Sequence, residues 1–316
     1  MKWEDLRRSS NVEDRRGMGS PGRGGGSLPS GSGGGGIINI LLMLLMSRGK
    51  GKWLIIGLLV LFMVAGGGSA LFGGGGTTST EYGNSGVVFE DTTQKAEQGD
   101  QVTDAEGEFL SVVLANTEDY WTQHFAENNL QYTPPKLVLY TEGTNTGGCG
   151  IGSSSAGPFY CPADQTVYID VSFYRDLSQK YGAPGDFAMA YVLAHEVGHH
   201  VQQLLGTMDD YQKTIQQNPS IKNELSVRVE LQADYYAGGW SKYVEEQGIL
   251  EEGDIEEALQ AAFAVGDDTL QKESYGYVVP DSFTHGTSAQ RQEWFSRGYK
   301  YAGDFEQADT FSQSIE

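Results

Sequence analysis

Two histidines and a glutamate stand close together in the apolar stretch 188–201, which reads AMAYVLAHEVGHHV. His195 and His199 are four residues apart, so on an α-helix their side chains lie on one face, one turn apart. Two imidazoles in that arrangement can hold one Zn²⁺ at about 2.0–2.1 Å from each nitrogen. Glu196 follows the first histidine, where its carboxylate can reach a metal-bound water and take its proton. The spacing therefore predicts a hydrolytic zinc site with Glu196 as the general base.

A catalytic zinc site takes three protein ligands and keeps a fourth position open. The best third ligand is Glu230, which stands four residues before Asp234 in a second stretch with helical spacing. Glu230 can then bind the metal while Asp234 orients a ligand imidazole through its free N–H. A solvated acidic face is the alternative, but the apolar and aromatic neighbours at 229, 231, 233 and 235–237 argue against exposure. Glu224 is a weaker alternative ligand.

Two further residues of the first motif carry information. His200 is five residues from His195, which turns it about 140° away from the ligand face. We interpret it as a packing or supporting residue. Gly198 lies inside the predicted helix, where glycine costs about 1 kcal/mol relative to alanine. A glycine there indicates that another backbone or a substrate passes close to the helix.

The C-terminal region offers two polar side chains for the same site. His285 precedes the last predicted helix and could donate a hydrogen bond to the oxyanion of a tetrahedral intermediate. A histidine that caps the helix is the alternative, beside Thr287 or Ser288 as the capping residue. Arg291, within that helix, could pair with one of the two site carboxylates or hold a substrate carboxyl group.

The remaining patterns predict the elements that must position these residues. Residues 207–223 are polar and irregular, which would let the two site helices fold back on each other. We expect the strand 166–170 to be the sheet edge that binds substrate backbone, with a core strand as an equally good alternative. His124 is interpreted as a core or surface histidine. Periodicity and residue type predict helices over 108–128 and 255–265, strands over 136–140 and 166–170, and a glycine-rich loop over 141–161.

The chain has two cysteines, Cys149 and Cys161. They could be metal ligands or form a disulfide. No further cysteine or histidine stands at zinc-site spacing, so we favour a disulfide that closes the glycine- and serine-rich loop. Such a bond would stabilise the fold by roughly 3 kcal/mol and indicates an oxidising compartment.

Charge is distributed unevenly along the 316 residues. Residues 1–76 hold nine Lys and Arg against four Asp and Glu, whereas the remainder holds twelve against 38. A domain this acidic will not bind nucleic acid by neutralising phosphates. The acidity is explained by solubility or a saline exterior.

The first hundred residues predict a membrane anchor. Residues 53–72 are twenty residues without a charge, long enough to span about 30 Å of hydrocarbon. A cleaved signal peptide is the alternative. All nine basic residues before position 53 precede this run, so the positive-inside bias places the N-terminus in the cytoplasm and the catalytic domain in the periplasm or outside the cell. The expected layout is a disordered tail over 1–36, an apolar and basic segment over 37–52, a transmembrane helix over 53–72, a linker over 73–104 and the domain over 105–316.

Taken together, these motifs resemble a known family. The His195-Glu196-x-x-His199 helix followed by Glu230-x-x-x-Asp234 looks like a gluzincin-type zinc peptidase. More narrowly, the chain resembles the bacterial membrane-anchored neutral zinc metallopeptidases. The resemblance covers most of the chain and rests on the stretches 11–17, 148–150, 157–164, 167–170, 195–200, 230–238 and 285–291. It implies a zinc site but says little about what is cut.

We therefore expect an α+β fold: a zincin-like metallopeptidase domain, mostly helical with a small sheet, after a disordered N-terminus and one transmembrane helix. The expected activity is peptide-bond hydrolysis with Zn²⁺ as cofactor, although two histidines and a glutamate accept other divalent ions too. A non-hydrolytic zinc-containing scaffold or chaperone-like module is the alternative, which the intact Glu196 disfavours. A redox module built on the two cysteines ranks last, because the tight Cys-x-x-Cys spacing is missing.

Overall fold

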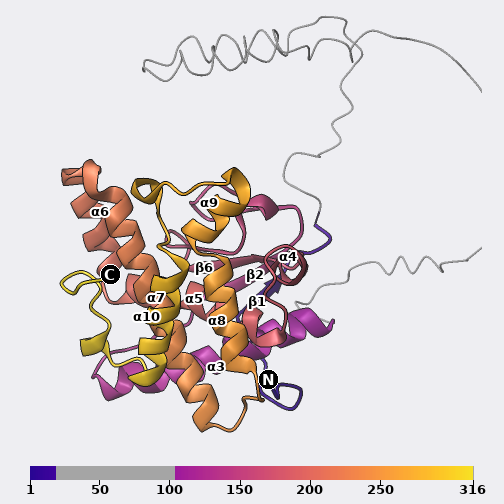
Figure 1. Ribbon diagram of the computed structural model, residues 1–316. Helices are drawn as coiled ribbons and strands as arrows, with labels where there is room; N and C mark the ends of the chain where they lie inside the picture. The colour runs from indigo at the N-terminus through magenta and orange to yellow at the C-terminus, as the bar shows by residue number, and fades with distance from the viewer. Residues whose placement is uncertain (19–103, 316) are drawn as a thin grey trace, which may run out of the picture. The chain divides into compact units, whose positions relative to one another are not determined.

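A computed structural model describes residues 1–18 and 104–315 of the chain (Figure 1). The expectations for 19–36, 37–52, 53–72 and 73–103 therefore lie outside the described residues. Among the helices that the structure does describe, none combines the length and the apolar character needed to cross a bilayer.

The described residues form a mostly helical α+β fold around a small mixed sheet, as the sequence predicts. Three adjacent strands of the sheet are parallel, and the fourth, at one edge, runs antiparallel to its neighbour. In spatial order the strands are β1 (Val12–Asp14), β2 (Lys136–Tyr140), β6 (Thr166–Asp170) and β5 (Phe159–Cys161). A separate antiparallel pair is made by β3 (Gly143–Asn145) and β4 (Ile151–Ser153).

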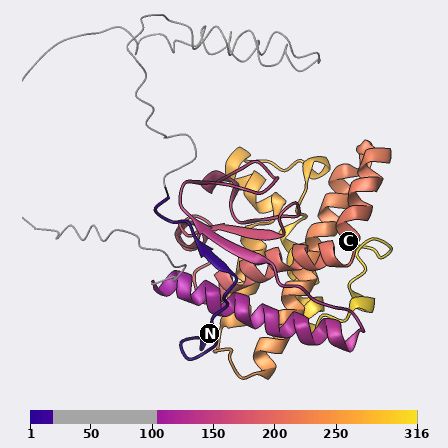
Figure 2. The same ribbon diagram turned by 180° about the vertical axis from the view of Figure 1, so that it is seen from behind.

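The helices supply most of the core. Helix α5 packs against α3, α7 and α8, and α7 packs in turn against α10. Figure 2, seen from behind, shows α3 running beside the sheet close to strand β1. The helices are α3 (Ala105–Glu127), α4 (Phe173–Gln179), α5 (Asp186–Leu204), α6 (Thr207–Gln217), α7 (Lys222–Glu246), α8 (Asp254–Ala264), α9 (Asp267–Tyr275) and α10 (Ser288–Lys300).

Two glycines let α7 lie unusually close to its neighbours. A Cβ on Gly198 of α5 would lie 3.0 Å from the carbonyl oxygen of Ala233 on α7. A Cβ on Gly298 of α10 would fall almost on the carbonyl oxygen of Tyr235, on the other side of α7. The close backbone expected from the glycine of the motif is therefore α7. This packing holds the acidic residues of α7 between α5 and α10.

The N-terminal tail is the largest departure from expectation. The expectation of a disordered 1–36 is wrong for residues 1–18, because this segment adds strand β1 to the sheet. Val12 is buried against the core, and side chains of Arg7, Ser9 and Asn11 donate to Glu118 on α3. The few apolar residues of the tail gave no hint of this pairing with a partner more than a hundred residues away.

Three smaller expectations also need correction. Strand β6 lies between β2 and β5, so it is a core strand; among the described strands the two edges of this sheet are β1 and β5. The stretch 207–223 is helix α6 and a short turn rather than irregular chain. The loop 141–161 contains β3, β4 and β5. Helices were expected over 108–128 and 255–265 and are found within three residues of those bounds.

Candidate metal centre

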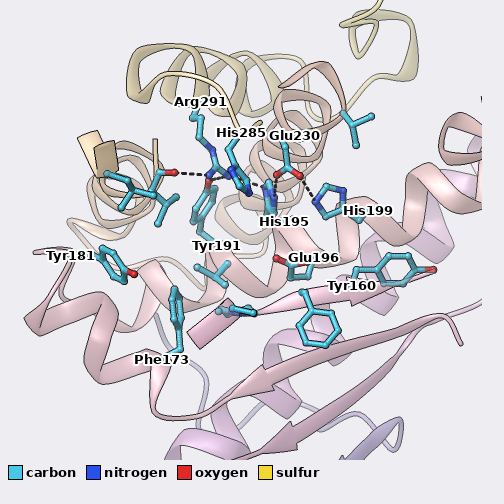
Figure 3. Close-up of a pocket in the computed structure, with 18 of the residues that line it drawn as sticks. Tyr160, Phe173, Tyr181, Tyr191, His195, Glu196, His199, Glu230, His285 and Arg291 are labelled. Atoms are coloured by element: carbon cyan, nitrogen blue, oxygen red, sulfur yellow. Dashed lines mark hydrogen bonds and ion pairs between the residues drawn. The ribbon is translucent and has the colours of Figure 1, made fainter. Parts of the chain in front are cut away.

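Three side chains from two helices converge, as the sequence predicts. The Nε2 atom of His195 lies 3.1 Å from one Glu230 oxygen, and the Nε2 atom of His199 lies 3.5 Å from the other. One ligand atom of each residue lies within 4.8 Å of those of the other two. Figure 3 shows both imidazoles and the Glu230 carboxylate pointing toward one another. Two imidazoles and a carboxylate are the donor set of catalytic zinc sites, so these residues fit a zinc ion.

Asp234 fixes the first imidazole from behind. Its Oδ1 atom accepts from Nδ1 of His195 at 2.8 Å and from the hydroxyl of Tyr191 at 2.5 Å. Arg291 of α10 donates two hydrogen bonds to the same carboxylate, from Nε at 2.8 Å and from Nη2 at 3.0 Å. Asp234 is fully buried and Arg291 nearly so. With Nδ1 committed as a donor, the Nε2 lone pair of His195 is left for a metal.

The second imidazole is held by amides instead of a carboxylate. Nδ1 of His199 lies 2.8 Å from Oε1 of Gln202, one turn further along α5. The Gln202 amide nitrogen donates to the carbonyl of Val229 at 2.7 Å and to the side chain of Gln232 at 3.0 Å, both on α7. This buried chain of hydrogen bonds ties the ligand helix to α7, which carries Glu230.

Charge within this cluster is balanced by opposed effects. Burial lowers the pKa of the His195 imidazole, but Asp234 and Glu230 outweigh it and raise the pKa to about 10. Burial raises the pKa of the Asp234 carboxyl, but Arg291 and His195 outweigh it and bring the pKa to about 2. The pKa of Glu230 falls well below its usual value for the same reason, with His199 and His195 as the partners. Both carboxylates are therefore ionised at neutral pH, and a metal must displace a proton from His195.

A cleft opens over the cluster, with a volume of about 640 Å³. Glu196 lines it and lies beside the two imidazoles (Figure 3). In the part of the chain that the structure describes, the Glu196 carboxylate has no hydrogen-bond or ion-pair partner. Strand β5 contributes Phe159 and Tyr160 to the same cleft. A carboxylate and a sheet edge thus face the space above the candidate ligands.

His285 also lines this cleft, on the loop before α10. Its Nδ1 atom lies 3.2 Å from Oδ1 of Asp267, and the other carboxylate oxygen accepts the backbone N–H groups of Thr284, His285 and Gly286. The side chain is about half exposed, at 49%. The hydrogen bond to Asp267 raises the pKa of His285, which favours the imidazolium. Thr287, not His285, caps α10 and forms a capping box with Gln290.

The remaining candidate residues are not metal ligands in this arrangement. Glu224 pairs with Arg228 at the surface, so the alternative third ligand is excluded. His200 is buried and hydrogen-bonded to the hydroxyl of Tyr160 and to the carbonyl of Thr133, as expected of a packing residue. His124 lies on α3 and packs against the rings of Tyr120 and Phe305. Arg291 reaches Asp234 rather than a substrate carboxyl group. Cys149 and Cys161 form the expected disulfide, which joins the glycine-rich loop to the end of β5.

Comparison with known proteins places this geometry in a family. The model of the family described as "Putative neutral zinc metallopeptidase" matches residues 1–311. The chain belongs to this family. It is 48% identical, over the whole of both chains, to a protein of Escherichia coli K12 named "Uncharacterized protein YpfJ". A Mycobacterium tuberculosis H37Rv protein named "Uncharacterized protein Rv2575" is 45% identical over 192 residues, which are 57% of this chain and 64% of that protein. No solved structure matches the chain.

Several residues of the site escaped sequence reasoning. Tyr191 and Gln202 stand one turn before His195 and one turn after His199, so helical spacing alone could have suggested them. Asp267 gave no comparable signal, because its contact with His285 depends on how a loop folds back. The position of β5 depends on strand order, which periodicity does not encode.

Proposed function

We propose that this protein is a zinc-dependent peptidase that hydrolyses peptide bonds with Glu196 as the general base. The observation that carries the proposal is the convergence of His195, His199 and Glu230 beneath a cleft that also holds the unpartnered Glu196 carboxylate. A non-hydrolytic scaffold has no use for a free carboxylate beside the metal ligands. Family membership supports the same reaction class.

A zinc ion bound by these three residues would polarise the scissile carbonyl and lower the pKa of a bound water to about 7. Glu196 takes the proton from the attacking water and passes it to the leaving amine. Asp234 and Gln202 hold the two imidazoles in the tautomer that presents Nε2 to the cleft. His285, whose pKa is raised by the hydrogen bond to Asp267, donates a hydrogen bond to the developing oxyanion when it is protonated.

The shape of the site supports an extended polypeptide as substrate. Strand β5 is one of the two edges of the described sheet and borders the cleft. A peptide in extended conformation can add to such an edge through backbone hydrogen bonds, next to the metal. Attachment to a membrane through the uncharged run 53–72 is part of the proposal and rests on its length and composition.

The test is a Glu196→Gln variant of the full chain, purified in detergent and assayed on unfolded polypeptides with and without a chelator. We expect it to keep one zinc per chain and to lose about 10²–10⁴-fold in turnover, the usual worth of a general base. Glu224→Gln is the matched control, because that residue is exposed on α7 outside the cluster. Wild-type turnover in Glu196→Gln, or chelator-resistant cleavage, would contradict the proposal.

A further inference from the structure

The N-terminal segment, residues 1–18, contributes a strand to the sheet of the folded domain formed by residues 104–315, which we call the body. Val12, Glu13 and Asp14 pair in parallel with residues 137–139 of strand β2. Hydrogen bonds continue on either side: the N–H of Leu137 donates to the carbonyl of Asn11 at 2.9 Å, and the N–H of Arg15 donates to the carbonyl of Leu139 at 2.8 Å. The segment is thus one strand of the sheet, not an appended tail.

Side chains of the segment also satisfy a buried charge of the body. Glu118 on α3 is 7% exposed. Its oxygens accept from Arg7 at 2.9 Å, Ser9 at 2.5 Å and Asn11 at 2.8 Å, all in the N-terminal segment. Without them a buried carboxylate would lose three hydrogen-bond donors, which is costly. The body therefore needs the segment in place.

This pairing restricts how the chain can meet a membrane. The apolar runs 37–46 and 53–72 both lie between the segment and the body in sequence. One crossing between them would put β1 and β2 on opposite sides of a bilayer about 30 Å thick, yet the two strands are hydrogen-bonded. We infer that residues 1–18 and 104–315 lie on the same side of the membrane. The inference rests on the proposed membrane attachment and replaces the single crossing expected from the sequence.

The same pairing changes what the basic residues say about orientation. Five of the nine that precede position 53 belong to the folded segment, and four of these five form ion pairs with carboxylates. Because these charges are paired with carboxylates of the described residues, they do not indicate which side of the membrane is cytoplasmic. Arg48, Lys50 and Lys52 remain between the two apolar runs. Run 37–46 has only ten residues, too few to span a bilayer about 30 Å thick, so these three charges do not fix the orientation. The Cys149–Cys161 disulfide does, because such bonds persist outside the cytoplasm, and we place both described parts of the chain there.

Single cysteines at exposed positions test the inference in cells that make the full chain. Ser10→Cys marks the N-terminal segment and Lys213→Cys marks the body; the parent chain, whose two cysteines form a disulfide, gives the background. We expect a membrane-impermeant maleimide to label both variants in intact spheroplasts as fully as after detergent. Labelling of one and protection of the other would overturn the inference. Protection of both would overturn the outward orientation.

A second experiment tests the pairing without a membrane or a peptidase assay. A site for a sequence-specific protease, inserted within residues 24–36 of the full chain, is cut in purified protein. We expect the N-terminal fragment to stay with the body through size-exclusion chromatography, and Glu118→Gln to release it faster than the matched control Glu106→Gln on the same helix. Immediate release from the unsubstituted chain would overturn the inference, whether or not the protein cleaves peptides.

Discussion

Arg291 offers a sharp test of how the candidate site is held together. Its guanidinium makes two hydrogen bonds to the fully buried Asp234, one to the hydroxyl of Tyr191 and one to the carbonyl of Val265. Without metal, the cluster sets the carboxylates of Glu230 and Asp234 against the cations of His195 and Arg291. An Arg291→Met variant keeps the apolar stem but leaves one buried negative charge uncompensated.

Breaking a buried ion pair from one side costs about 3–5 kcal/mol. A domain of this size loses roughly 2–4 °C of melting temperature per kcal/mol, so we expect a fall of about 6–20 °C in metal-free protein. The measurement is thermal unfolding in excess chelator, with Arg175→Met on the exposed face of α4 as the control. Zinc affinity should also fall by about 10–100-fold, because Asp234 loses the group that positions it.

The double variant Arg291→Met/Asp234→Asn separates charge from packing. It removes both charges, so it should unfold at a higher temperature than Arg291→Met alone, and the two substitutions should be strongly non-additive. If Arg291→Met melts within about 4 °C of the parent, or if the two effects simply add, the guanidinium does not compensate the charge of Asp234.

Three further predictions follow from the same structure. Because His195 has a pKa of about 10 in the metal-free cluster, zinc must displace its proton, so zinc affinity should rise about tenfold for each unit that the pH increases, up to that pKa. Calorimetry in two buffers of different ionisation enthalpy should detect the released proton. Zinc binding without proton release would show that His195 is not protonated in the metal-free protein. Asp267 raises the pKa of His285, so Asp267→Asn should lower that pKa and move the alkaline limb of kcat/KM to lower pH; an unmoved limb would remove His285 from the reaction. Gly298→Ala should destabilise the fold more than Gly198→Ala, because its Cβ would collide with the backbone carbonyl of Tyr235. Chemical denaturation should show a much larger loss in the free energy of unfolding for Gly298→Ala.

The candidate ligands could be predicted because their chemistry is written into local spacing. A separation of four residues places His195 with His199, and Glu230 with Asp234, on single helical faces. The apolar neighbours of each pair indicated burial, and burial of four ionisable groups requires that they meet. The glycine inside the motif even signalled the close approach of α7. Such signals need no knowledge of distant parts of the chain.

The features that local sequence patterns do not encode depend on long-range pairing. Strand β1 is three residues long and was hidden in a polar tail; only its partner β2 makes it a strand. The order of strands decided that β5, not the strand 166–170, borders the cleft. Asp267 reaches His285 because a loop returns to the start of α9. Periodicity describes which face of an element is buried, not which neighbour buries it.

The proposed function requires that His195, His199 and Glu230 bind one divalent cation between α5 and α7. X-ray absorption at the zinc edge, on the purified full chain loaded with one equivalent of zinc, identifies the ligands of the metal. We expect a shell of nitrogen and oxygen at about 2.0–2.2 Å, with the outer-shell pattern of two imidazoles, and loss of bound zinc in Glu230→Ala. A sulfur shell, fewer than two imidazoles, or full zinc occupancy in Glu230→Ala would contradict it.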